Sequence, residues 1–361
     1  MSIVLFLFNF ILTNIIFGLI LCSCLIRLDK NISYSSYELL LYSFGLGPAL
    51  TSLFLYYLLL LVPHVSNGFY VIVIISIYAG LLWFGRKDLL VAPKEIRGRL
   101  KFGWKKYRSS SVFPKMETLF FILFFFLLIL FFLHISSHIL LRPLTGNDIL
   151  EYAAQGKALF SLKHIEFRSP ILNTETGFYR PSFHAPGFSL LLTWEMMIDS
   201  LWKSQNDLYF KCLSLYFGLL IILLQAYWLS RKSKRLALLG TVALLTALNF
   251  FYSFLSFHID TYRIFFLMVA WIYLAYALDK KDSLSFLLLG VFSGLAAFAH
   301  SLGVPIALLT GLVFFAFLRG NFLAKLKAAA FVGLTMLACG GLHYVIDLFW
   351  GAGWILPIWH S

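Results

Sequence analysis

Long, uninterrupted runs of apolar residues are the feature that most restricts how this chain can fold. Crossing the hydrocarbon core of a membrane as a helix takes about 20 apolar residues, and runs of that length recur along the whole chain. Of the 361 residues, 61% are hydrophobic and only 12% are charged. That is too little charge to cover the surface of a soluble domain. The sequence therefore predicts an all-α, polytopic transmembrane helix bundle.

The apolar runs predict about ten membrane spans. They are residues 3–26, 38–62, 69–85, 118–141, 208–229, 236–254, 261–278, 284–299, 302–318 and 326–349. A further apolar run, 186–202, contains Glu195 and Asp199. Charges near the middle of a bilayer are costly. We therefore expect 186–202 to lie in the membrane interface or to re-enter the membrane, and not to cross it.

The net charge of +13 arises from basic residues that are concentrated in loops. Ten Lys and Arg residues lie between residues 86 and 115, and further basic connectors follow at 231–235, 279–282 and 319–327. Basic loops mark the cytoplasmic side of a membrane protein. The charge is therefore interpreted as a topology signal that also contacts anionic lipid, and not as a sign of nucleic-acid binding.

Placing the basic loops inside the cell fixes the rest of the topology, with the N-terminus outside. The expected units are three N-terminal transmembrane helices (1–85), a basic cytoplasmic loop (86–117), a transmembrane core (118–349) and an exterior tail (350–361). Within the core we expect an exterior loop at 142–185 and an interfacial helix at 186–202. All nine histidines then fall in the exterior half of the molecule, so polar chemistry is expected on that face.

The exterior loop opens with a stretch that predicts a helix bearing two acids, "TGNDILEYAAQGKALF" (145–160). Thr145 and Asn147 are good capping residues, and Asp148 falls in the first turn, where the helix dipole favours an anion. Asp148 and Glu151 share one helical face. A carboxylate shielded from bulk water can act as a general base, so both acids are candidate catalytic residues. The alternative is that Asp148 merely stabilises a solvated loop helix.

Two further segments bring basic side chains to the same face, "GFYRPSFHAPGFSLLL" (177–192) and "FHIDTYRIFF" (257–266). A phosphate leaving group already carries negative charge, so it needs cationic hydrogen-bond donors more than it needs a general acid. The cationic candidates for binding the donor phosphate are Arg180, His184, His258 and Arg263, and the acid Asp260 is grouped with them because it lies between His258 and Arg263. His300, in "AFAHSLG", is added as a secondary candidate.

Signals for metals and cofactors are sparse. "HISSH" places His134 and His138 one helical turn apart, which is a spacing compatible with metal binding, but no third ligand is evident. We expect neither a metal nor a cofactor, with a divalent ion at these two histidines as the alternative. His343 and Asp347 also stand one turn apart, and we expect them to pair.

The order of these motifs resembles that of the GT-C superfamily of membrane glycosyltransferases. The likeness rests on "EYAAQGKAL" after the loop-opening acid, on "HAPGFSLLL", and on the lone Asp in "HIDTYRIFFLMVAWIYLAYAL". It covers about 118–349 and is nearest to the protein O-mannosyltransferase and aminoarabinose transferase group. The chain departs from the family where many relatives have an adjacent Asp-Glu pair, here Asn147-Asp148. It departs again at His-Ala-Pro, where relatives have a basic residue before two prolines.

The resemblance implies a GT-C-like core that moves a sugar from a polyprenyl-phosphate donor to a lipid, glycan or protein acceptor. The active face would be the exterior face of the cell membrane. Asp148 matches the acid that handles the acceptor, Asp260 matches the later exterior acid, and 184–186 matches the segment near the donor phosphate. The expected partners are the donor and membrane lipids. A lipid-linked-sugar flippase or transporter, or a non-catalytic assembly subunit, stays open as an alternative, and so do the sugar, the acceptor and the oligomeric state.

The topology is tested at Asn173, in the middle of the expected exterior loop. Asn173→Cys should react with a membrane-impermeant thiol reagent added to intact cells, because 142–185 is expected to be exterior. The control is Ser110→Cys in the basic loop, which should react only after the inner side has been opened. The four native cysteines lie within apolar runs and should stay unlabelled. The reverse order of labelling would invert the topology.

Overall fold

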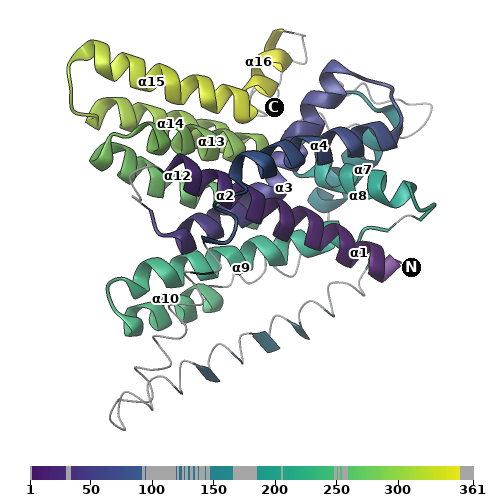
Figure 1. The fold of residues 1–361 in the computed structure, drawn as a ribbon, viewed down its shortest axis with the longest axis horizontal. Coiled ribbons are helices and arrows are strands. Elements are labelled where there is room, and N and C mark those ends of the chain that lie inside the picture. Colours follow the sequence, from purple (N-terminus) through teal and green to yellow (C-terminus); the bar gives the residue numbers. More distant parts are fainter. Residues whose placement is uncertain are drawn as a thin grey trace.

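The structure is a computed structural model of the full chain. It describes residues 2–29, 34–91, 147–165, 185–204, 206–247 and 259–349, together with isolated positions between 94 and 143 and at 250 and 253. Within these residues the regular elements are all helices, and none is a strand (Figure 1). The predicted all-α class is thereby confirmed.

Six helices in the described part of the chain are long and apolar enough to cross a membrane. They are Ile3–Leu28, Ser36–Leu61, Asn67–Gly85, Leu208–Ser230, Asp260–Lys280 and Phe322–Asp347. Each overlaps one of the predicted runs, so the chain has the helices of a membrane protein. The runs at 284–299 and 302–318 form shorter helices. The run at 236–254 is helical over Lys234–Thr246, which is also shorter than a membrane span, and 118–141 lies largely outside the described residues.

The helices divide into three groups along the sequence. The first is α1 (Ser2–Phe10), η1 (Ile11–Ile16), α2 (Phe17–Leu28), α3 (Ser36–Leu61) and α4 (Asn67–Gly85). The second is α7 (Asn147–Leu162), α8 (Ser189–Ser200), α9 (Leu208–Ser230) and α10 (Lys234–Thr246). The third is α12 (Asp260–Lys280), α13 (Ser283–Ala299), α14 (Gly303–Phe317), α15 (Phe322–Met336), η2 (Leu337–Gly341) and α16 (Leu342–Phe349). Both η1 and η2 are π-helical turns within longer helices.

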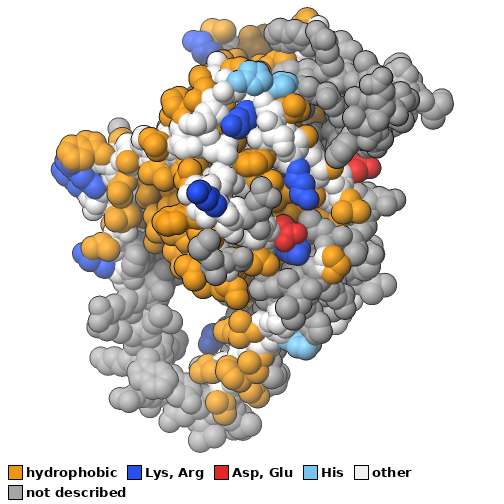
Figure 2. Space-filling view, turned by 90° about the vertical axis from the view of Figure 1, so that its right-hand side faces the viewer, with side chains coloured by type: hydrophobic (Ala, Val, Ile, Leu, Met, Phe, Trp, Pro, Cys, Tyr) orange, Lys and Arg blue, Asp and Glu red, His pale blue; other side chains and the backbone are white. Residues whose placement is uncertain are grey.

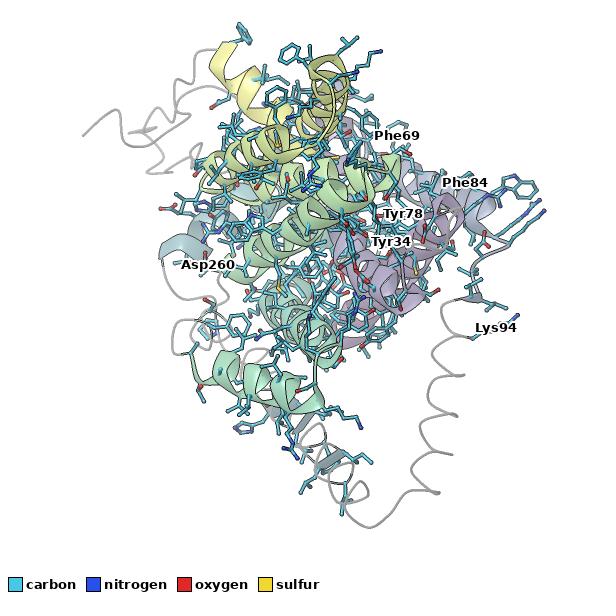
Figure 3. All side chains as sticks on the ribbon, turned by 90° about the vertical axis from the view of Figure 1, so that its left-hand side faces the viewer. Tyr34, Phe69, Tyr78, Phe84, Lys94 and Asp260 are labelled. Atoms are coloured by element: carbon cyan, nitrogen blue, oxygen red, sulfur yellow. The ribbon has the colours of Figure 1, made fainter. Side chains whose placement is uncertain are left out.

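Polar side chains tie several helix ends together at one end of the bundle. Glu38, in the first turn of α3, accepts hydrogen bonds from the hydroxyls of Tyr42 at 2.7 Å and Tyr276 at 2.9 Å. Tyr34, just before α3, shares a hydrogen bond with Ser285 at the start of α13. The start of α3, the start of α13 and the end of α12 therefore share one face, as alternating spans require. Tyr34 lies well inside this end of the bundle in Figure 3.

The opposite end gathers the other ends of the same helices. The Tyr56 hydroxyl, near the end of α3, lies 3.4 Å from Nδ1 of His343 in α16. The backbone N–H of His64, just after α3, donates to the carbonyl of Lys163 after α7 at 3.1 Å. Helices α7 and α8 lie at this end, on the right of Figure 1. This is the end that the sequence predicts to be exterior.

Helix α8 packs inside the bundle. Residues 189–199 are all buried, against α7, α3, α4 and α9. Its 12 residues rise about 18 Å, well short of the roughly 30 Å hydrocarbon core. The length agrees with a segment that does not cross the membrane, while its expected position at the interface stays a prediction.

Glu195, one of the two acids in that segment, joins α8 to the start of α9. Its side chain is 1% exposed, and its two carboxylate oxygens accept hydrogen bonds from the backbone N–H groups of Tyr209 at 2.7 Å and Phe210 at 3.0 Å. Burial raises the pKa of the Glu195 carboxyl, and the two N–H bonds act in the opposite direction. The first N–H groups of a helix have no partner within the helix, and the helix dipole favours an anion near them. Glu195 supplies both the hydrogen-bond acceptors and the acidic group at the start of α9.

The first helix is fixed to α8 and α9 by buried polar groups around η1. The indole N–H of Trp194 and the hydroxyl of Thr13 donate to Asn9 Oδ1 at 3.1 and 2.9 Å. The Tyr209 hydroxyl donates to Asn14 Oδ1 at 3.1 Å. Three segments that are far apart in sequence therefore meet in one buried hydrogen-bond network. The oxygens of Asn9 and Asn14 are satisfied in this network, whereas their side-chain N–H groups have no partner among the described residues.

Replacing Glu195 should destabilise the bundle. Glu195→Ala leaves two buried N–H groups of α9 without their acceptor, and each such loss costs about 1–3 kcal/mol. The measurement is thermal unfolding of the protein in detergent. The control is Asp279→Ala, at an exposed position near the end of α12, which should unfold like wild type. Equal unfolding temperatures for the two variants would contradict the capping role.

Candidate functional site

Helix α7 carries the two acids that the sequence predicts to be catalytic. It begins at Asn147, so Asp148 lies in its first turn, as expected. Its buried face consists of Ile149, Tyr152, Ala153, Gly156 and Leu159. Glu151 lies beside this face and is partly buried. The structure thus confirms the helix and the place of both acids along it, whereas the side chain of Asp148 is outside what the structure describes.

Close packing holds α7 against the start of α8. The carbonyl of Gly156 accepts a hydrogen bond from the Thr193 hydroxyl at 2.9 Å, and the Ser189 hydroxyl donates to Gln155 Oε1 at 2.6 Å. Gln155 follows Glu151 by one turn, on the helical side that bears the acids. The acid-bearing side of α7 therefore borders the start of α8.

The short segment 185–188, which leads into α8, is the centre of the candidate site. Ala185 is fully buried and packs in one cluster with Tyr344 of α16. The N–H of Gly187 donates to the carbonyl of Phe298, near the end of α13, at 3.3 Å. The segment that the resemblance assigns to the donor phosphate thus ends against α13 and α16. Two of its predicted basic residues, Arg180 and His184, lie outside the described residues.

Phe188 connects this segment to α7 and α12. Its ring centroid lies 5.8 Å from that of Tyr152 on α7 and 5.5 Å from that of Tyr262 on α12. Aromatic pairs at such separations contribute packing energy and fix orientation. Because Tyr262 lies in the first turns of α12, the buried rings bring the start of that helix to the same end as α7. His258, which precedes α12, is not among the described residues.

The two predicted site residues at the start of α12 pair with each other. The Arg263 guanidinium donates to Asp260 Oδ1 at 2.6 Å, and both side chains are partly exposed. Asp260 lies at the edge of the bundle in Figure 3. Since a guanidinium has five N–H donors, one carboxylate contact does not use up its capacity. The sequence analysis named both residues as candidates for binding the donor phosphate, but it did not predict that they form an ion pair.

His300 follows the last residue of α13, close to the same segment. Its Nδ1 accepts a hydrogen bond from the backbone N–H of Leu302 at 3.0 Å. An imidazole nitrogen that accepts a hydrogen bond carries no proton, so the proton of the neutral ring is on Nε2. His300 is therefore held as an Nε2–H donor at the end of the bundle that contains 185–188.

The structure adds α16 and the end of α3 to the site, which the sequence did not single out. The Tyr344 hydroxyl donates to the carbonyl of Ala297 at 2.7 Å, and His343 contacts Tyr56. The sequence feature that pointed toward these helices was the predicted location of all nine histidines, His343 included, in the exterior half of the molecule. It could not show that α3 and α16, at opposite ends of the chain, meet.

The alternative of a divalent metal ion at His134 and His138 is not supported by a complete set of ligands among the described residues. Among them, no group of three or more His, Cys, Asp and Glu side chains is arranged to hold a metal ion. Of the two histidines in "HISSH", His134 is described and His138 is not. A different pair, His64 and His164, has ring centroids 5.0 Å apart. Figure 2 shows neighbouring histidines, with scattered basic and acidic groups, among apolar side chains on this end.

Comparison with known proteins gives no family assignment. No protein-family model, no curated protein and no solved structure matches the chain. The GT-C resemblance therefore stays an expectation, and the candidate site rests on its residues and geometry.

The contact between α7 and α8 can be tested at Gly156. A Cβ atom there would lie 2.7 Å from the carbonyl oxygen of Ser189 and 3.1 Å from the Cβ of Leu192. Gly156→Ala should therefore push α7 away from α8 and destabilise the protein by about 1–3 kcal/mol.

Gly80→Ala on α4 is the matched control, because nothing lies within 4 Å of its added Cβ. Alanine favours a helix over glycine by about 1 kcal/mol, so this variant should be neutral or more stable. Thermal unfolding in detergent compares the two variants. A Gly156→Ala protein as stable as Gly80→Ala would contradict the close contact.

Proposed function

We propose that this protein is an integral membrane glycosyltransferase of the cell membrane, with about ten spans and a GT-C-like core. It would move a sugar from a polyprenyl-phosphate donor to a lipid, glycan or protein acceptor on the exterior face. The observation that supports this most is convergence at one end of the bundle. There, segment 185–188 packs between α7, which bears the acids, the start of α12, which bears Arg263, and the ends of α13 and α16.

The acids of α7 would serve the acceptor. A hydroxyl that attacks an anomeric carbon becomes a better nucleophile when a base takes its proton, and the base must lie within hydrogen-bond reach. Asp148 is the first candidate because it opens the helix, where the dipole favours its charged, basic form. Glu151, one turn along and partly buried, is the second.

The basic groups would serve the donor. The leaving phosphate carries negative charge in the ground state and gains more in the transition state, so charge-assisted donors stabilise both. Arg263 would contribute from the start of α12, where its guanidinium pairs with Asp260. Arg180, His184, His258 and Asp260 complete the proposed donor-binding group, with His300 as an N–H donor nearby. Membrane lipid and the polyprenyl tail would lie against the apolar sides of the helices.

A transporter or lipid-linked-sugar flippase is the second candidate, and one observation favours it. Two of the membrane-length helices are interrupted by π-helical turns, η1 and η2, and within η2 Gly340 leaves the helical conformation with φ 152°. Interrupted helices often line transport sites. The two functions separate in detergent, because a transferase works on a soluble acceptor analogue there and a flippase needs a sealed membrane. An assembly subunit would be inactive in both assays.

The catalytic proposal is tested by Asp148→Asn. The amide keeps the size of the side chain but removes the basic oxygen, so sugar transfer should fall by about 10²–10⁴-fold while donor binding changes little. Glu151→Gln is made in parallel as the second candidate base. If both variants keep wild-type transfer, α7 is only a capped loop helix and has no catalytic role.

Arg263→Ala provides the contrasting result. It removes a phosphate contact that exists in the ground state as well, so donor binding should weaken together with transfer. Donor binding is measured with radiolabelled polyprenyl-phosphate sugar, and transfer with the same lipid plus acceptor. Arg235→Ala, at an exposed position on α10, is the control and should leave both unchanged. Unchanged donor binding in Arg263→Ala would remove Arg263 from the donor site.

A further inference from the structure

The ends of α2 and α4 are in close contact at the end of the bundle opposite the candidate site. A Cβ atom on Gly85, the last residue of α4, would lie 3.0 Å from the backbone nitrogen of Cys24 on α2. The Cys24 thiol also donates to the carbonyl of Leu81 on α4 at 3.2 Å. These contacts hold the last turn of α2 beside the last turn of α4.

Each of these helix ends carries an exposed arginine that lies over an aromatic ring of α4. The guanidinium of Arg27, in the last turn of α2, lies 4.9 Å from the ring centroid of Phe84. That of Arg86, directly after α4, lies 3.5 Å from the ring of Trp83. Trp83 is 70% exposed, and Figure 3 shows Phe84 at the outer edge of the bundle. We call these four side chains the arginine patch.

The protein leaves the N–H edges of the two guanidinium groups without an anionic partner. An aromatic ring covers the flat face of a guanidinium, whereas its five N–H donors project from the edge. Among the described residues, no carboxylate forms an ion pair with Arg27 or Arg86. Arg231 differs, although it also lies over an indole, because it donates to the Tyr276 hydroxyl at 3.4 Å. The arginine patch can therefore donate to a group outside the protein.

The charges along the chain next to the patch favour an anion. Lys87 and Lys94 are both exposed. The nearest acids in sequence are Asp29, which accepts the backbone N–H of Tyr34 at 2.9 Å, and Asp88, which is partly buried. One of these acids is thus engaged with the protein, while the basic side chains face outward. An anionic group at the patch would meet a positive potential.

The patch also lies at the depth where lipid head groups are found. It is at the end of a helix that is long and apolar enough to cross a membrane, and tryptophan is enriched at the interface between membrane and water. A helix C-terminus favours cations, which holds both arginines at this level. Their long side chains carry the guanidinium charge beyond the last carbonyl groups.

We propose that the arginine patch binds the head group of an anionic phospholipid. The phosphate accepts hydrogen bonds from the guanidinium edges, and the exposed rings of Trp83 and Phe84 contact the glycerol and the upper acyl chain. A zwitterionic lipid has the same phosphate, but the basic surroundings repel its cationic group. The inference is independent of the proposed transferase activity, because the patch lies at the other end of the bundle.

The test measures lipid binding by the purified full-length protein in detergent, by native mass spectrometry. Wild type should bind phosphatidylglycerol at least tenfold more tightly than phosphatidylcholine. Arg27→Gln and Arg86→Gln should each weaken phosphatidylglycerol binding by about 10–100-fold, the range for hydrogen bonds to a charged group. The control is Arg319→Gln, at an exposed position between α14 and α15. It should weaken binding by about fivefold at most, the effect of one diffuse basic charge.

Two further measurements distinguish a site from general attraction. Arg27→Lys and Arg86→Lys keep the charge but lose the planar fork of donors, so they should recover only part of the lost affinity. Brominated phosphatidylglycerol should quench Trp83, measured as the fluorescence quenching that wild type shows and Trp83→Phe lacks. Unfolding temperatures of all variants should equal that of wild type, because the two arginines are exposed.

Three results would overturn the inference. Equal losses in Arg319→Gln and in the two patch variants would show diffuse attraction without a site. Full recovery of affinity in the lysine variants would show that charge alone suffices and that the arginine fork has no role. Displacement of phosphatidylglycerol by millimolar inorganic phosphate would show that the patch takes a soluble anion and not a lipid.

Discussion

Every polar backbone group inside a membrane must find its partner within the protein, and the arrangement of this bundle depends on that constraint. Long helices meet it along their lengths, but a short internal helix such as α8 creates additional helix ends in a dry place. The start of α9 is one of these ends. Glu195 supplies two acceptors for it, so a residue that appears unsuited to an apolar segment makes the turn between α8 and α9 possible.

Once α8 is fixed inside the bundle, it determines what gathers around its start. Gly156 lets α7 approach, and Gly187 lets the segment before α8 reach Phe298 on α13. Phe188 then fills the space between α7 and α12. Small residues allow close backbone contact and one large ring fills the remainder, which is how membrane helices pack without a hydrophobic driving force between them. The candidate site lies at this junction because separate segments meet there.

The sequence predicted what depends on local pattern and missed what depends on tertiary contact. Hydropathy located the six helices in the described part of the chain that are long enough to cross a membrane, and capping residues with dipole chemistry placed Asp148 in the first turn of α7. The role of Glu195 could not be read from its neighbours, because its partners belong to the next helix. The meeting of Tyr56 with His343 joins positions 287 residues apart. Arg180, His184 and His258 lie outside the described residues, so that part of the predicted site stays a prediction.

Three buried acids show how position decides the role of a carboxylate in this protein. Glu38 accepts hydrogen bonds from two tyrosine hydroxyls, and Glu195 accepts them from the first turn of a helix. Asp347 lies near the C-terminal end of α16, where the helix dipole disfavours a negative charge. The first two acids are satisfied internally and hold helices together. The helix dipole that stabilises the charge of Glu195 therefore acts against the charge of Asp347, although the two side chains carry the same chemical group.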